Sequence, residues 1–170
     1  DGFPAGFSID IEELNRFVEK RRPGQSKLVT QRKEEDQVEF LSGVFEGKTT
    51  GTPIAFLIRN ADAKSKDYDH NDTVYRPSHA DYTYDKKYGL RDHRGGGRSS
   101  ARETVARVVA GGIALQYLAQ KGIQFQAFVD QVGNIRLPWK DQHSDHLSYS
   151  ESEIEDSLVR CPDEVISKKM

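Results

Sequence analysis

The sequence predicts an α+β fold, because helical and short strand patterns lie close to one another along the chain. Apolar residues recur at helical spacing over 8–20 and again from Ser100 to Gly122. Two short runs, 38–44 and 53–59, are typical of strands and are connected through a turn at 45–47. We therefore expect these runs to form a hairpin or neighbouring antiparallel strands.

The first predicted helix, 8–20, has clear start and stop signals. Ser8 or Asp10 can cap its N-terminus, and Asp10 with Glu13 fits a capping box. Ile11, Leu14, Phe17 and Val18 share one face, and Pro23-Gly24 ends the helix after three basic residues.

The second predicted helix carries the stronger pattern. Ser100 and Glu103 match a capping box, and small and apolar residues cover most of the following surface. The pair Gly111-Gly112 costs helix stability, so we expect another backbone to pack closely against it. The pattern predicts a central, largely buried helix.

The remaining stretches are less regular. The sequence predicts a polar loop over 60–74, a strand over 123–132, an acidic and serine-rich linker over 141–157, and a short final helix. The chain begins without Met and stops within a helical pattern, so we expect a single-domain fragment over 1–170.

Composition excludes several classes of protein. The formal net charge of the 170 residues is −2, which argues against a general nucleic-acid binder, since such proteins present a broad basic surface. No apolar run reaches the ~18 residues of a membrane-spanning helix. Cys161 is the only cysteine, which excludes an internal disulfide, suits the cytoplasm, and leaves no cysteine-based metal cluster. The histidines form no good metal-ligand set, so we expect no metal.

One basic window predicts an anion site. Between Arg76 and Arg102 lie seven basic residues and three aspartates, together with the glycine run 95–97. Glycines let backbone N–H groups approach an anion, and the helix that follows adds the positive end of its dipole. The window therefore indicates a phosphorylated or otherwise anionic small ligand. The alternative is a structural turn with its arginines in solvent, and no P-loop or dinucleotide motif is present.

Side chains from this window and from the end of the first predicted helix are candidates for the site. His79 lies two residues before Asp81, and a histidine near a carboxylate can donate a proton close to neutral pH. A surface or structural role for His79 stays open. Arg102 faces the same end of its helix as the glycines, and the turn after Arg21 and Arg22 can aim one of these two arginines into a site.

Five blocks of sequence together resemble chorismate synthase. They are RRPGQS (21–26), LSGVFEGKTTGTPIAFLI (41–58), RPSHADYTY (76–84), KYGLRDHRGGGRSSARET (87–104) and RVVAGGIA (107–114). The resemblance runs from Asp1 to about Gly122 and is weak beyond Gly133. It implies a β-α-β sandwich in which central helices lie between antiparallel sheets.

The resemblance also implies an activity. Members of this family are lyases of the shikimate pathway of aromatic amino acid biosynthesis. They eliminate phosphate and a ring hydrogen from 5-enolpyruvylshikimate 3-phosphate in a 1,4-anti reaction that gives chorismate and requires reduced FMN. The family implies a cytoplasmic homotetramer that acts on a small molecule, with no nucleic acid and no membrane. NADPH or an external reductase would reduce the flavin, and both stay open.

Site residues follow from the same motifs. The resemblance implies that His79 is catalytic and protonates reduced flavin, that Arg98, Ser99, Ser100 and Arg21 contact the cofactor, and that Arg76 and Arg102 hold the phosphorylated substrate. Lys27 stands where the family often has arginine, and lysine lacks bidentate phosphate recognition.

Two departures and one alternative accompany this interpretation. The family's N-terminal Gly-Glu-Ser-His-Gly motif and its C-terminal half have no counterpart in these residues, so we expect the 170-residue chain alone to be inactive. The alternative function is a non-catalytic phosphate- or nucleic-acid-binding module, because the glycine–arginine run with nearby tyrosines superficially resembles an RNA-binding stretch.

Overall fold

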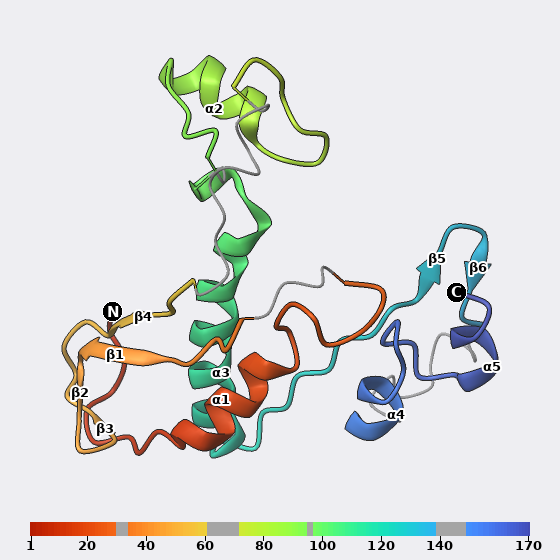
Figure 1. Cartoon of the computed structure of the whole chain (residues 1–170). Coiled ribbons are helices and arrows are strands. Elements are labelled where there is room, and N and C mark those ends of the chain that lie inside the picture. The colour runs from red at the N-terminus through yellow and green to blue at the C-terminus, as the bar shows by residue number, and fades with distance from the viewer. Residues whose placement is uncertain (30–33, 61–71, 95–96, 139–148) are drawn as a thin grey trace. The chain divides into compact units, whose positions relative to one another are not determined.

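A computed structural model describes residues 1–29, 34–60, 72–94, 97–138 and 149–170 (Figure 1). The chain divides into two compact units, 1–122 and 123–170, and each is described by itself. The expectation of a single domain over 1–170 stays a prediction. The regular elements among the described residues are helices and small antiparallel sheets, which confirms the α+β class.

The first helix, α1 (Ile11–Glu19), begins where the capping signal predicted. The Asp10 carboxylate accepts a hydrogen bond from the backbone N–H of Glu13 at 2.8 Å, so Asp10 rather than Ser8 is the N-cap. Leu14 and Val18 point into the core and are almost fully buried.

The two predicted strands are antiparallel neighbours, as expected. β1 (Glu39–Ser42) pairs with β4 (Ala55–Leu57), and a small hairpin of β2 (Val44–Phe45) and β3 (Lys48–Thr49) lies between them. Gly43 has a φ of 78°, and a Cβ there would lie 2.6 Å from the Ile54 Cα. Only glycine fits this close approach of two backbones.

The long helix, α3 (Thr104–Ala119), starts after two short 3₁₀ turns, η2 (Gly97–Ser99) and η3 (Ala101–Glu103). Ser100 Oγ accepts a hydrogen bond from the backbone N–H of Arg102 at 3.3 Å. The Glu103 carboxylate binds the Arg107 guanidinium one helical turn later. The predicted capping box is therefore not formed, because Glu103 pairs with a side chain rather than with the N-cap backbone.

The core of the first unit lies where α3 crosses α1 (Figure 1). The buried apolar residues of this core are Phe7, Ile9, Leu14, Val18, Val109 and Ile113. A Cβ on Gly112 would lie 2.6 Å from Leu14 Cδ1 and 3.0 Å from Phe17 Cδ1, whereas one on Gly111 would meet nothing within 4 Å. The predicted close approach is thus made at Gly112 alone, and by side chains of α1 rather than by another backbone.

The prediction that α3 is largely buried is wrong within the described part of the chain. Only Val109, Gly112 and Ile113 are buried. α1 covers one face of α3, and no described residues bury the other apolar face. This helix therefore carries more apolar side chains than the described part of the chain buries.

A further helix, α2 (Asp81–Tyr88), was not predicted. It has no apolar face, because aromatic and charged residues are mixed around the helix. The spacing of apolar residues in the sequence therefore gave no helical signal. Gly89, with a φ of 69°, ends it in the left-handed conformation.

The second unit contains a two-stranded hairpin and two short helices. They are β5 (Gln131–Val132), β6 (Ile135–Arg136), α4 (Glu151–Glu155) and α5 (Glu164–Ser167). The predicted strand 123–132 is wrong except for its last two residues, because 123–130 finds no ladder partner among the described residues. Residues 149–157 of the predicted linker include α4, which Ser150 and Glu153 begin with a capping box.

Most of the predicted loop 60–74 and residues 141–148 lie outside the described residues.

Candidate active site

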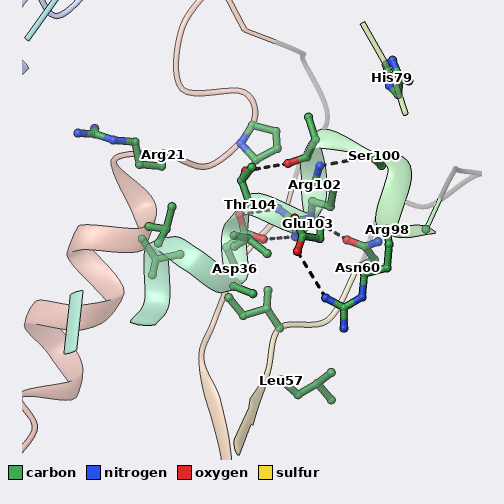
Figure 2. Close-up of a pocket in the computed structure, with 18 of the residues that line it drawn as sticks. Arg21, Asp36, Leu57, Asn60, His79, Arg98, Ser100, Arg102, Glu103 and Thr104 are labelled. Atoms are coloured by element: carbon green, nitrogen blue, oxygen red, sulfur yellow. Dashed lines mark hydrogen bonds and ion pairs between the residues drawn. The ribbon is translucent and has the colours of Figure 1, made fainter. Parts of the chain in front are cut away.

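An open groove in the first unit gathers side chains from segments far apart in the sequence (Figure 2). Its volume is about 1240 Å³. The arginines that line it are Arg21, Arg76, Arg94, Arg98 and Arg102, and the carboxylates are Asp36, Asp92 and Glu103. Five guanidiniums against three carboxylates give the groove a positive excess, which suits an anionic ligand.

Six of the seven predicted site residues line this groove. They are Arg21, Arg76, His79, Arg98, Ser100 and Arg102. The exception is Ser99, whose hydroxyl lies behind the lining and donates to the Asp81 carboxylate at 3.0 Å. Folding thus brings together residues from three of the sequence blocks.

Arg102 is held by two side chains from other segments. Its Nη1 donates to Asp36 Oδ2 and its Nε to Asn60 Oδ1, each at 2.9 Å, and its Nη2 also binds Asp36. The buried Asp36 carboxylate raises the pKa of the Arg102 guanidinium, chiefly through these hydrogen bonds. Three of the five N–H donors of Arg102 are used in this way, and two have no partner among the described residues.

Arg76 is held by a second carboxylate. Its Nε donates to Asp81 Oδ2 at 2.8 Å and its Nη2 to Asp81 Oδ1 at 2.9 Å, a bidentate pair. The hydrogen bonds from Arg76, followed by that from Ser99, hold the pKa of Asp81 well below its usual range despite full burial. Asp81 is therefore an anion under all ordinary conditions.

Arg98 and Ser100 lie at the turn that precedes α3. Arg98 is 75% exposed, and its Nη1 lies 3.5 Å from Glu103 Oε1 (Figure 2). An exposed ion pair of this kind is weak, so an incoming phosphate can take the place of the carboxylate. Gly97 begins this turn with a φ of 48°, and Gly95 and Gly96 lie outside the described residues.

The chorismate synthase family model matches residues 1–170, the whole chain. The chain belongs to the chorismate synthase family. Curated relatives named chorismate synthase include those of Christiangramia forsetii, Parabacteroides distasonis and Cytophaga hutchinsonii, at 61%, 56% and 53% identity. Each comparison covers all of this chain and 46% of the relative, so the chain spans about half the length of the curated relatives it matches.

A solved structure agrees with this membership of the chorismate synthase family. The crystal structure of a chorismate synthase superposes with a TM-score of 0.72 at 33% identity, covering 99% of this chain and 45% of that one. The prediction of the family and of its fold type is therefore confirmed.

His79 lies at the edge of the groove, apart from the other labelled side chains (Figure 2). Its Nδ1 is 3.1 Å from the carbonyl oxygen of Pro77, close enough to donate a hydrogen bond there. The neighbouring carboxylate that we expected to tune His79 is Asp81, but that group binds Arg76 and Ser99 instead. Arg21 follows α1, is exposed, and donates to the carbonyl oxygen of Lys20 at 3.3 Å.

Sequence reasoning missed three partners of the site arginines: Asp36, Asn60 and Asp81. The spacing of Arg76 and Asp81 within one block was the only available signal for the third. Asp36 and Asn60 lie 66 and 42 residues from Arg102, and no local pattern connects them.

In the described ranges, no group of three or more His, Cys, Asp or Glu side chains could hold a metal ion. None of the helices among the described residues is long and apolar enough to cross a membrane.

Proposed function

We propose that the protein is a chorismate synthase, a lyase that converts 5-enolpyruvylshikimate 3-phosphate to chorismate with the help of reduced FMN. The observation that carries this proposal is the convergence of six motif residues on one arginine-lined groove, in a chain that matches the family from end to end. The relatives that bear this name are about twice as long, so the activity is proposed for the protein at its native full length.

The substrate phosphate is the group that Arg76 and Arg102 would bind. Both guanidiniums line the groove and are held by buried carboxylates, so they keep their orientation before the ligand arrives. Negative charge grows on the phosphate as its C–O bond breaks, and preorganised donors stabilise that charge. Since these donors are fixed beforehand, they need little reorganisation during the reaction.

The FMN phosphate fits a second group of donors. Arg98 and Arg21 present exposed guanidiniums to the groove and Ser100 contributes a hydroxyl, a donor set suited to a phosphate. A volume of about 1240 Å³ exceeds the ~300–1,000 Å³ of single-ligand pockets, which leaves room for cofactor and substrate together. When bound, reduced FMN supplies an electron-rich ring that offsets charge developing on the substrate ring.

The remaining assignments follow from the family. His79 would be the residue that supplies a proton to reduced FMN. Ser99 supports the cofactor turn from behind, through Asp81. NADPH or an external reductase supplies the electrons. The protein is a cytoplasmic homotetramer of the shikimate pathway, and it acts on a small molecule rather than on nucleic acid or a membrane.

An anaerobic assay tests the proposal at native full length. Chorismate should form from 5-enolpyruvylshikimate 3-phosphate when dithionite-reduced FMN is present, and not when flavin is omitted or oxidised. Equal turnover without flavin would refute the mechanism. Absence of turnover together with nucleic-acid binding that weakens steeply with salt would favour the non-catalytic alternative.

A further inference from the structure

Asp81 is a fully buried carboxylate directly behind the groove, and it is not among the groove-lining residues. Oδ1 accepts from Arg76 Nη2 and from Ser99 Oγ, and Oδ2 accepts from the Nε and the backbone N–H of Arg76. A second guanidinium, Arg91 Nη1, lies 3.7 Å from Oδ2. Both oxygens are thus surrounded by donors.

These contacts join two segments of the groove that are separate in sequence. Arg76 and His79 belong to the turn before α2, whereas Ser99 belongs to the turn that presents Arg98 and Ser100. A backbone hydrogen bond from Ala80 N to the Ser99 carbonyl oxygen, at 3.3 Å, runs beside the side-chain contacts. The Asp81 carboxylate therefore connects the substrate arginine to the cofactor turn.

A purely local role does not account for this arrangement. Asp81 is the first residue of α2, where a carboxylate is favoured by the helix dipole. The contacts of the side chain nevertheless go to Arg76, Ser99 and Arg91 rather than to the N–H groups of its own helix. A residue needed only to begin α2 would not require full burial among these groups.

We propose that Asp81 is a positioning residue that fixes Arg76 and the Ser99 turn in the orientation that binds the anionic ligands of the groove. The bidentate pair restricts the guanidinium to one plane, so less side-chain freedom is lost when a phosphate binds. The inference rests on the proposed function, because the ligands are the substrate and FMN.

Asp81→Asn in the native full-length protein is the direct test. The amide keeps the size of the side chain but loses the charge and sets N–H groups against the donors of Arg76. We expect the KM for substrate and the Kd for FMN, measured by fluorescence, to rise by about 10- to 100-fold. The matched control is Asp85→Asn, which removes a carboxylate from the same helix outside the groove and should change both values by less than about twofold.

A double-mutant cycle separates positioning from a general effect on folding. If Asp81 acts on substrate through Arg76, Asp81→Asn should raise the substrate KM by less than about threefold in an Arg76→Ala background. Equal losses in both backgrounds would overturn the proposal.

Arg76→Lys gives a test that does not depend on the folding of the Asp81 variant. Lysine keeps the positive charge but cannot form the bidentate pair, so substrate affinity should fall nearly as far as in Arg76→Ala. Wild-type affinity in this variant would overturn the proposal, because a point charge would then suffice.

Inorganic phosphate distinguishes failure of this inference from failure of the proposed function. A wild-type protein without turnover refutes the proposed function, and the same variants are then titrated with inorganic phosphate. Weaker phosphate binding by Asp81→Asn but not by Asp85→Asn supports positioning. Equal phosphate binding by the two variants, or no phosphate binding by the wild type, overturns the positioning role of Asp81.

Discussion

The adjacent glycines of α3 should respond differently to the same substitution. Gly111→Ala adds a methyl group that meets no described atom within 4 Å beyond the adjoining turns of its own helix, so only helix propensity changes. That change should raise the free energy of unfolding by about 0.5–1 kcal/mol. Gly112→Ala gains the same propensity but places its Cβ 2.6 Å from Leu14 Cδ1.

The contact at Gly112 cannot be relieved cheaply. Leu14 is 1% exposed and packs within the core, so its side chain has little room to move. Overpacking of this kind costs about 1–3 kcal/mol, which offsets or exceeds the gain in propensity. Because both positions lie inside one helix, propensity cancels in the comparison, and Gly112→Ala should be less stable than Gly111→Ala by about 1–3 kcal/mol.

Urea unfolding of the 170-residue chain, followed by far-ultraviolet circular dichroism, measures this difference. Both variants should show similar m-values, so that the midpoints report stability directly. Two variants of equal stability would refute the packing of α3 on α1 as described. A more stable Gly112→Ala would refute it more strongly.

Four further outcomes are expected. Since the folded-state pKa of Asp81 is lowered, its stabilisation is present above the ~3.9 of unfolded aspartate and is lost as the pH falls below it, so Asp81→Asn should flatten the acid limb of stability against pH. His79→Ala should lower kcat by about 10²–10⁴-fold with little change in KM, and a loss confined to KM would show a binding role. Arg102→Ala should weaken substrate binding and also destabilise the fold by roughly 3 kcal/mol, because Asp36 is left buried without its partner; adding Asp36→Asn should restore stability but not affinity. The 170-residue chain alone should form no chorismate and should bind FMN weakly in a titration, and tight stoichiometric binding would contradict this.

Local signals predicted those parts of the fold that local interactions decide. Asp10 begins α1 because its carboxylate reaches the Glu13 N–H within one turn, and the pairing of β1 with β4 follows from short connections and strand composition. The strand predicted at 123–132 failed because its apolar alternation says nothing about whether a ladder partner is present. α2 was missed because its residues show no apolar period.

In the candidate site too, local sequence signals predicted some residues and missed those that depend on tertiary contacts. Motifs indicated which arginines meet in the groove, because each motif is a short local block. Their carboxylate partners depend on tertiary contacts, such as the one between Arg102 and Asp36. The positions of charged residues in the sequence do not show which of them will pair. The helix-capping pattern at Ser100 and Glu103 failed for a related reason, since Arg107 competes successfully for the Glu103 carboxylate.

The carboxylates around the groove act as internal counter-ions. Arg76, Arg94, Arg98 and Arg102 pair with Asp81, Asp92, Glu103 and Asp36. Four unpaired guanidiniums would repel one another and oppose a compact state. With counter-ions in place, the chain can fold before any ligand arrives, and at the exposed Arg98–Glu103 pair binding becomes an exchange of the carboxylate for a phosphate. A phosphate brings several oxygens to such an exchange, whereas chloride brings a single charge without bidentate geometry, so the abundant monovalent anions of the cell compete poorly.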